Sequence, residues 1–215
     1  KKRPPKPKYA SRWDAGDVIA YFKSNDRLSK FSCKLFTGRV CTLLLLATGQ
    51  RPQFLAELKC NNLEIHENHL IITVNPMCLK QDRRGYVYDP IKIEKFDNCI
   101  ICIFTHLKQY LYLTAPIRGD CESLFICTTS PFRTASKNTI YRWVKETLSA
   151  AGVNTAKFGP ASTRSASTSK ALQGKADIET ILKAGGWSRE GTFQKFYKRP
   201  IKRVQSFAKA VFDEI

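Results

Sequence analysis

Apolar residues follow a helical period over the first part of the chain. Asp14 precedes the first helix as its cap, and a second, strongly apolar helix is predicted over about residues 29–47. The break Thr48-Gly49-Gln50 ends this helix, and Arg51 begins a further helical turn. The side chains expected in the core of this region are Val18, Ile19, Phe22, Leu35, Val40, Leu43, Leu44, Leu46, Phe54, Leu55 and Leu58.

A change to alternating apolar and polar positions marks the middle of the chain. Residues 63–66 and 69–74 predict a β-hairpin, and residues 86–91 predict a third strand. Between the last two strands, residues 80–85 (Lys-Gln-Asp-Arg-Arg-Gly) predict a basic tip. Such a tip is a solvated loop, a general phosphate contact or the carrier of a more specific lysine, Lys80.

Helical patterns return after the sheet. They cover about residues 100–113, 137–150, 160–173 and 177–184, and a further helix begins at Ser188. The expected caps are Ser136, Asp177 and Ser188. Residues 201–215 carry an apolar stripe that either packs on its own domain or docks on a neighbouring subunit. The whole pattern predicts a mainly α fold with a small three-stranded antiparallel sheet.

The charge of the chain adds a polyanionic partner to this picture. The chain has 215 residues, 43% of them hydrophobic, and can bury the core of one large or two small domains. Its formal net charge of +18 favours nucleic acid as the partner, with an anionic membrane surface as the alternative. We expect no membrane segment, because no run reaches ~18 apolar residues and no N-terminal signal pattern is present.

Eight cysteines bear on the cellular compartment and on metal binding. Most lie inside apolar runs such as residues 99–102, which indicates reduced, buried thiols in an intracellular protein. The alternative is a structural zinc site, for which the candidate ligands are Cys99, Cys102, His106, His66 and His69. No second matched pair completes a tetrahedral set, so we expect neither a metal nor a cofactor.

Residues 1–12 begin Lys-Lys-Arg-Pro-Pro-Lys-Pro-Lys, a composition that forms neither helix nor sheet. It predicts an extended basic linker. We expect this linker to follow DNA, with Lys6 and Lys8 near phosphates, and to lead to an N-terminal domain that the sequence does not contain. A solvated tail and part of a nuclear-import signal are the alternatives.

Small and hydroxyl-bearing residues surround one arginine later in the chain. In residues 159–171, Pro160 suits the first turn of a helix, and Gly174 suits its end. Small side chains let a ligand approach closely, and Arg164 at a helix N-terminus favours a phosphate. Arg51 is a second arginine in an unusual place, directly after a core helix and a glycine break. A buried salt bridge is the other explanation for Arg51.

Five motifs in order resemble the tyrosine recombinases, the phage-integrase family. They are Ala-Thr-Gly-Gln-Arg51, Lys80 in a β-hairpin, Ser-Thr-Arg164-Ser-Ala-Ser, Gly-Trp187-Ser and Phe-Tyr197. The sequence looks closest to the eukaryotic branch carried by Crypton, Ngaro and DIRS-type mobile elements. Each side chain alone fits simple packing or an ion pair, and only their joint order favours the family.

The resemblance implies a fold and a domain organisation. Residues 13–200 would form the tyrosine-recombinase (integrase) catalytic domain. Residues 201–215 would form a C-terminal helix, with docking in trans as one option. The N-terminal core-binding domain that such enzymes normally carry is absent from the sequence.

The resemblance also implies a role for each motif. Tyr197 would attack a DNA phosphodiester and form a 3′-phosphotyrosyl bond, which requires no metal or ATP. Arg51 and Arg164 would hold the non-bridging oxygens of the transition state. Lys80 would protonate the leaving 5′-oxygen, and Trp187 takes the place where many members have a histidine. Further DNA contacts are expected from Lys6, Lys8, Arg83, Arg84, Ser162, Thr163, Lys198 and Arg199.

One position departs from the family pattern. The family's helix carries His-x-x-Arg, whereas Ala161 lies three residues before Arg164. Loss of the histidine predicts impaired cleavage, since a general acid/base effect is worth ~10²–10⁴-fold. Three explanations stay open: an engineered change, natural decay, or replacement by water or another side chain.

Two functions of different classes follow. The first is a mobile-element recombinase in the nucleus that acts on double-stranded DNA, as a dimer on one site and a tetramer in synapsis. The second is a domesticated DNA-binding module without chemistry. Both predict steep salt dependence of DNA binding, so position 161 rather than charge distinguishes them.

Overall fold

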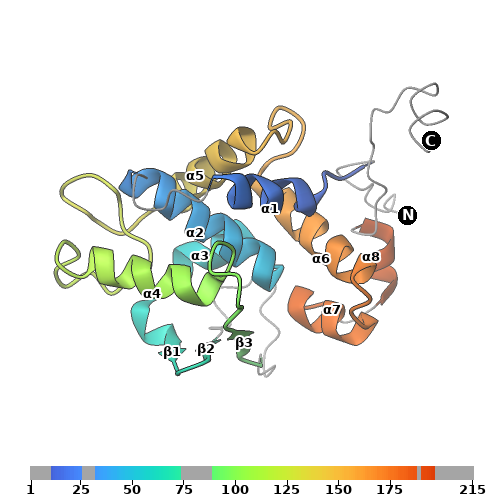
Figure 1. The fold of residues 1–215 in the computed structure, drawn as a ribbon, viewed down its shortest axis with the longest axis horizontal. Coiled ribbons are helices and arrows are strands. Elements are labelled where there is room, and N and C mark those ends of the chain that lie inside the picture. Colours follow the sequence, from blue (N-terminus) through green and yellow to red (C-terminus); the bar gives the residue numbers. More distant parts are fainter. Residues whose placement is uncertain (1–10, 26–31, 74–88, 188–189, 197–215) are drawn as a thin grey trace, which may run out of the picture.

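The computed structural model describes residues 11–25, 32–73, 89–187 and 190–196 (Figure 1). The helices of these segments are α1 (Ala15–Ser24), α2 (Cys33–Thr48), α3 (Pro52–Glu57), α4 (Ile103–Thr114), α5 (Lys137–Ala150), α6 (Thr163–Gln173), α7 (Ile178–Gly185) and α8 (Glu190–Phe196). Short 3-10 turns cover Cys60–Asn62 and Pro160–Ser162, the latter labelled η4. Helices dominate the molecule, and one small sheet lies at its edge (Figure 1). The predicted fold class is therefore confirmed.

Three helices begin at the residues that their sequences predict. Asp14 caps α1, since its Oδ1 accepts from the Gly16 amide at 2.8 Å. Ser136 caps α5 by accepting from Thr139 N at 3.1 Å, and Asp177 caps α7 by accepting from Thr180 N at 2.7 Å. The third cap bond also lowers the pKa of Asp177 below its ordinary value, because the Thr180 hydroxyl and amide both donate to the carboxylate. The predicted cap Ser188 lies outside the described residues.

Helix α2 is the centre of the core and lies between α4 and α5 (Figure 1). Val40 and Leu44 are fully buried and Leu43 nearly so, as predicted. The same prediction is wrong for Leu35, which is 54% exposed, and Leu46 is only half-buried. The helix begins at Cys33, so Leu35 lies in its first turn, where none of the described helices covers it. Leu45 fills the core position that the sequence pattern assigned to Leu46.

The sheet consists of β1 (Leu63–Ile65), β2 (His69–Ile72) and β3 (Ile91–Glu94) in the order β1-β2-β3, all antiparallel. The first two strands form the predicted hairpin. The prediction of a third strand over residues 86–91 is wrong at Asp89 and Pro90, which lie outside the strand, and it ends three residues too early; residues 86–88 lie outside the described residues. Pro90 has no amide to donate to the ladder, so pairing starts after it. Ile93 then pairs with Leu70, and both are buried.

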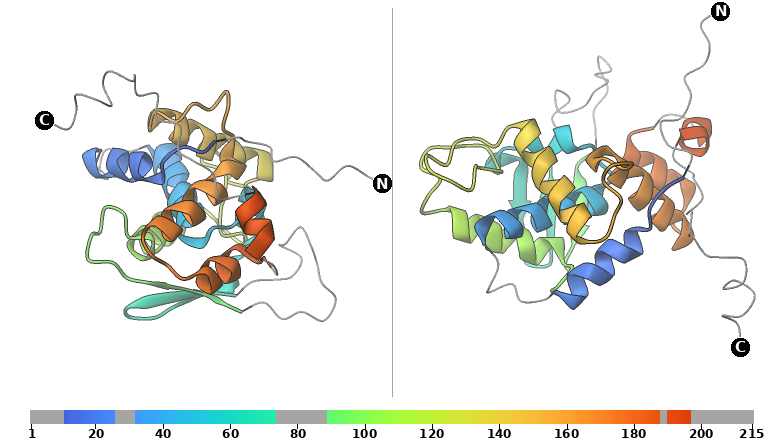
Figure 2. Two further views of the ribbon diagram at one scale, coloured as in Figure 1. Left: turned by 90° about the vertical axis from the view of Figure 1, so that its right-hand side faces the viewer. Right: turned by 90° about the horizontal axis from the view of Figure 1, so that it is seen from above.

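The segment before α1 packs on the domain. Ser11 and Arg12, the last residues of the predicted linker, are buried, as is Trp13. These residues run from α1 across to α6 (Figure 2). Burial lowers the pKa of the Arg12 guanidinium, and the nearby Asp14 carboxylate counteracts this. Residues 1–10 lie outside the described part of the chain.

The thiols are divided between core and surface. Cys41 and Cys102 are buried, which confirms the core prediction for these two. Cys33 and Cys99 are exposed, so the prediction is wrong there. No three His, Cys, Asp or Glu side chains of the described residues are grouped to hold a metal ion. None of the helices in the described part of the chain has the length and apolar character needed to cross a bilayer.

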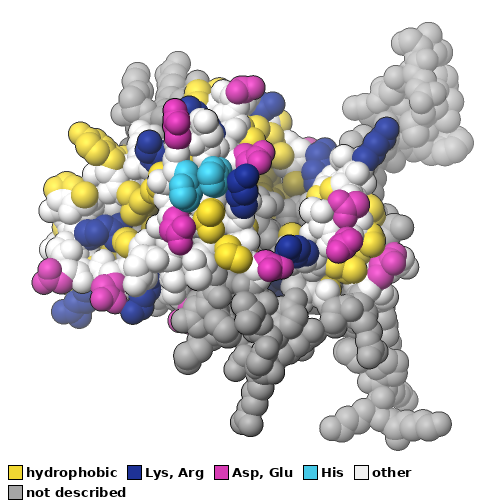
Figure 3. Space-filling model, turned by 90° about the horizontal axis from the view of Figure 1, so that it is seen from below, with side chains coloured by type: hydrophobic (Ala, Val, Ile, Leu, Met, Phe, Trp, Pro, Cys, Tyr) yellow, Lys and Arg dark blue, Asp and Glu magenta, His cyan; other side chains and the backbone are white. Residues whose placement is uncertain are grey.

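Two histidines lie at the turn between β1 and β2. The rings of His66 and His69 stack with centroids 4.4 Å apart. Lysine, arginine and acidic side chains mix on the surrounding face (Figure 3). This face is therefore not uniformly basic, although the net charge of the chain is high.

Candidate active site

Arg164, the second residue of α6, is the centre of the candidate site. Its side chain is only 3% exposed. Nη1 donates to the Gly49 carbonyl at 3.2 Å, and Nη2 donates to the Gly185 carbonyl. One planar guanidinium thereby joins the end of α2 to the end of α7 and holds its own orientation.

Trp187 covers one face of this guanidinium. The Cζ atom of Arg164 lies 4.2 Å from the centre of a Trp187 ring, a cation–π arrangement. The other neighbour of the indole is Phe193 of α8, with ring centroids 5.5 Å apart. Trp187 therefore connects the arginine to the helix that leads toward Tyr197.

Gly185 makes this stacking possible. A Cβ atom added to it would lie 2.1 Å from atoms of the Trp187 ring, far inside van der Waals contact. Glycine is therefore the only residue that fits at position 185 while the Trp187 indole keeps its position.

Arg51 enters the site from the loop that ends α2. Gly49 closes the helix with a left-handed backbone (φ 63°), and Gln50 is buried. The Gln50 Nε2 donates to the Ala184 carbonyl at 2.8 Å, so this loop is bonded directly to α7. Arg51 itself is half-buried at the start of α3, and its guanidinium makes no hydrogen bond or ion pair with another described residue.

The structure thus brings together three of the motifs singled out in the sequence. Residues 49–51, Arg164 and residues 185–187 meet through the two carbonyl bonds and the ring contact. The chain segments that carry Arg51 and Arg164 therefore lie together at this junction.

The turn before α6 carries the position at which the family has histidine. Ala161 is exposed, while Pro160 and Ser162 on either side are buried. Ala161 contributes no group that can move a proton.

The side chains of Ser162 and Thr163, for which DNA contacts are predicted, make hydrogen bonds inside the protein. Ser162 Oγ donates to the Gly159 carbonyl at 2.7 Å and accepts from the Trp13 indole N–H at 2.8 Å. Thr163 Oγ1 donates to the Pro160 carbonyl at 2.7 Å, and both side chains are buried. Their hydroxyls satisfy the backbone of a tight turn, a use that a hydroxyl-rich sequence also predicts.

Several predicted site residues lie outside the described residues. They are Lys6, Lys8, Lys80, Arg83, Arg84, Tyr197, Lys198 and Arg199. Their roles stay predictions. Helix α8 ends at Phe196, immediately before Tyr197.

Sequence reasoning missed two polar contacts that support the site. Gln50 was noticed only as part of a motif, although a buried glutamine beside a candidate arginine indicates a positioning bond. Position 13 marked only the beginning of the expected catalytic domain, residues 13–200. The contact of Trp13 with Ser162 spans 149 positions, so no local pattern indicated it.

Comparisons with known proteins bear on the fold. The sequence matches no protein-family model and no curated protein. Among solved structures, XerA recombinase is similar with a TM-score of 0.60 at 18% identity, over 99% of this chain and 66% of that one. XerH site-specific recombinase bound to its difH substrate has a TM-score of 0.65 at 18% identity, over 89% and 51%. A lambda integrase tetramer bound to a Holliday junction has a TM-score of 0.54 at 18% identity, over 94% and 52%.

These similarities establish the fold. The described chain has the mainly helical fold with a small antiparallel sheet that the tyrosine recombinases XerA, XerH and lambda integrase share. The chain spans about half to two-thirds of the length of these proteins.

Proposed function

We propose that this chain is the catalytic domain of a tyrosine recombinase, which cuts and rejoins DNA through a 3′-phosphotyrosyl intermediate. The observation that carries the proposal is the position of Arg164. Its guanidinium joins the loop of Arg51 to the segment of Trp187, so three motifs far apart in the sequence lie together, which supports a role in binding one anion. The fold similarity to recombinases supports the same assignment.

In the proposed reaction, Arg51 and Arg164 hold the non-bridging oxygens of the scissile phosphate. Their charge stabilises the extra negative charge of the phosphorane transition state. The hydroxyl oxygen of Tyr197 attacks phosphorus and loses its proton, and the bond from phosphorus to the 5′-oxygen breaks. Lys80 gives the leaving 5′-oxygen a proton. A 5′-hydroxyl from another strand then reverses both steps and restores the tyrosine.

The substrate and assembly state complete the proposal. We assign the chain to a mobile element of the Crypton, Ngaro and DIRS type, acting in the nucleus on double-stranded DNA, as a dimer on one site and as a tetramer in synapsis. The net charge of +18 supports a DNA partner, and the motif resemblance supports the element type.

Ala161 gives the alternative function its support. Its exposed methyl group replaces a proton-transfer residue at the turn before Arg164. The expected impairment is ~10²–10⁴-fold in cleavage. If no other group compensates, the domain is a DNA-binding module without chemistry.

Covalent trapping on a nicked suicide DNA duplex tests the proposal. The chain is compared with Ala161→His and with Ala161→His combined with Tyr197→Phe. We expect a denaturation-resistant protein–DNA adduct that increases with Ala161→His and disappears with Tyr197→Phe. DNA binding without any adduct, in both this chain and Ala161→His, would favour the binding module.

A further inference from the structure

The indole of Trp13 is bonded to the turn that precedes Arg164. Its Nε1 donates to Ser162 Oγ at 2.8 Å, and the same hydroxyl donates to the Gly159 carbonyl at 2.7 Å. Trp13 is 7% exposed and Ser162 is 4% exposed, so both bonds form away from water. Buried hydrogen bonds of this kind are costly to break, because a lost partner leaves a desolvated polar group.

The neighbours of Trp13 attach to the same part of the chain. Lys157 Nζ donates to Ser11 Oγ at 3.1 Å, and Lys170 Nζ lies 3.8 Å from Asp14 Oδ1. We call residues 11–14 the N-terminal segment. These three side-chain contacts go to residues 157–170, the loop and helix that build the Arg164 end of the site.

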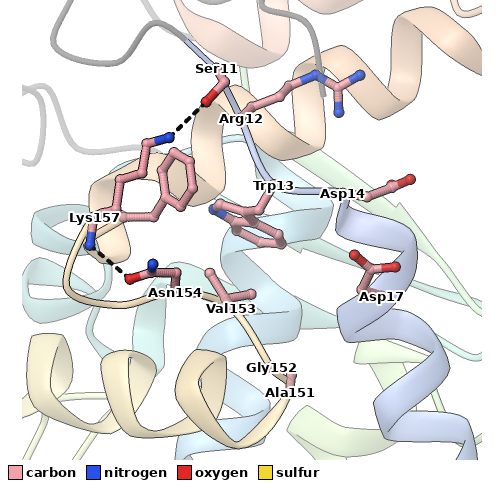
Figure 4. Close-up of a pocket in the computed structure, with 11 residues that line it drawn as sticks. Ser11, Arg12, Trp13, Asp14, Asp17, Ala151, Gly152, Val153, Asn154 and Lys157 are labelled. Atoms are coloured by element: carbon pink, nitrogen blue, oxygen red, sulfur yellow. Dashed lines mark hydrogen bonds between the residues drawn. The ribbon is translucent and has the colours of Figure 1, made fainter. Parts of the chain in front are cut away.

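A cavity of about 250 Å³ lies beside this segment. Figure 4 shows the Trp13 indole at its centre, with Asn154 and Lys157 on one side and Asp17 on the other. The segment is therefore packed on the domain on one side and borders the cavity on the other.

The turn transmits a shift of the N-terminal segment over a short distance. Ser162 belongs to the three-residue turn η4, and Arg164 follows two positions later in α6. Thr163 is bonded to the Pro160 carbonyl at 2.7 Å, so turn and helix form one unit. A displaced Ser162 therefore moves Ala161 and the start of α6 together.

We propose that Trp13 is a positioning residue for the turn that contains Ala161 and precedes Arg164. Through this turn, the position of the N-terminal segment is coupled to the orientation of the two candidate arginines, Arg51 and Arg164. The coupling makes phosphate alignment depend on how the chain enters the domain. This inference rests on the proposed function only for its effect on DNA cleavage.

Three variants separate the hydrogen bond from mere packing. Trp13→Phe removes the indole N–H and keeps an aromatic ring, and Ser162→Ala removes the acceptor. The matched control is Tyr110→Phe, which removes a buried hydroxyl that accepts from Ile126 N at 3.1 Å in α4, outside the site. The double variant Trp13→Phe/Ser162→Ala tests whether the two changes act through one bond.

The first readout is amide hydrogen exchange, which needs no catalysis. We expect the amides of residues 162–164 to exchange roughly 5- to 10-fold faster in Trp13→Phe and in Ser162→Ala, the size of one lost buried bond. The double variant should add little, and Tyr110→Phe should leave these amides unchanged. Unchanged exchange in Trp13→Phe, or fully additive effects, would overturn the coupling.

The second readout is single-turnover cleavage in the Ala161→His background. We expect Trp13→Phe to lower the cleavage rate about 10-fold while the DNA dissociation constant stays within about 2-fold. The positioning role would be overturned if the Ala161→His parent cleaves DNA and Trp13→Phe speeds amide exchange without changing the cleavage rate. If the background itself makes no adduct, the proposed function fails, and hydrogen exchange alone still decides the coupling.

Discussion

The guanidinium carbon of Arg164 lies 4.2 Å from the centre of a Trp187 ring, while the same guanidinium donates to the Gly185 carbonyl two residues earlier. A single side chain thus holds the segment of Trp187 by its backbone and by its ring. The orientation of the Arg164 guanidinium and the placement of α8 are consequently set by the same contacts.

Trp187→Leu is expected to reduce cleavage about 10-fold, with DNA affinity nearly unchanged. The change removes the ring contacts with Arg164 and Phe193, and a cation–π contact is worth about 0.5–2 kcal/mol. Trp187→Phe should retain most of the activity, because it keeps an aromatic face. Single-turnover rates and DNA binding by anisotropy measure the two effects. A loss of binding equal to the loss of rate would contradict the idea that Trp187 acts through alignment.

The two arginines should differ in their effect on stability. Arg164→Lys loses the planar fork that reaches two carbonyls, so we expect the free energy of unfolding to fall by about 1–3 kcal/mol. Arg51 is half-buried and makes no side-chain bond with another described residue, so Arg51→Lys should stay within about 0.5 kcal/mol. Both variants should cleave ~10²–10³-fold more slowly.

Urea denaturation and adduct formation separate these contributions. Equal loss of stability in both variants would show that Arg51 has a structural partner. Full cleavage by either variant would remove that residue from phosphate binding.

Gly185→Ala is expected to destabilise the domain by about 1–3 kcal/mol, since the new methyl group overlaps the Trp187 ring and the indole has to move. Cleavage should fall with it. Gly191→Ala is the matched control, because an added Cβ meets no atom within 4 Å there. In helix α8 this control should be neutral or stabilising by up to ~1 kcal/mol. Comparable melting temperatures for the two variants would argue against close packing of the Trp187 ring on Gly185.

The cap of α7 predicts a pH-dependent contribution to stability. The folded-state pKa of Asp177 lies below its ordinary value because Thr180 donates to the carboxylate. The stabilisation is therefore present above the unfolded-state pKa and lost as the pH falls through the folded-state pKa. Asp177→Ala should melt at a lower temperature than the parent at pH 6. The difference should shrink as the pH falls below about 4.

Asp120→Ala, a change at an exposed position outside any helix, is the control for that comparison. Melting curves recorded between pH 7 and pH 2 give the difference in melting temperature between each variant and the parent. A difference that does not change with pH would assign the effect to helix propensity instead of the charged cap.

Local chemistry predicts much of the fold. The caps Asp14, Ser136 and Asp177 each bond the amides that the sequence assigns to them, because a cap needs only residues two or three positions away. Leu35 shows the limit of periodicity. A helical stripe identifies a buried face, but not which turn of the helix extends beyond its neighbours. The third strand was misplaced for a related reason, since the partner β2 decides where pairing begins.

The candidate site divides in the same way. Motif order connected Arg51, Arg164 and Trp187, and the structure brings these positions together. What holds them is largely backbone: the carbonyls of Gly49, Ala184 and Gly185 accept the decisive bonds. Every residue has a carbonyl, so such partners leave no sequence signal. The Ser162 hydroxyl, predicted to contact DNA, bonds an internal turn, and composition alone does not distinguish these two uses.

The long-range bonds of the site have a consequence for biosynthesis. Arg164 and Gly49 are 115 positions apart, Gln50 and Ala184 are 134 apart, and Trp13 and Ser162 are 149 apart. At ~5–20 residues per second, a ribosome needs roughly 7–30 s to make the last of these spans. Helices α1 to α5 emerge before α6, which also packs on α2. A nascent chain can therefore complete the bonds of the candidate site only after residues 184 and 185 have been made.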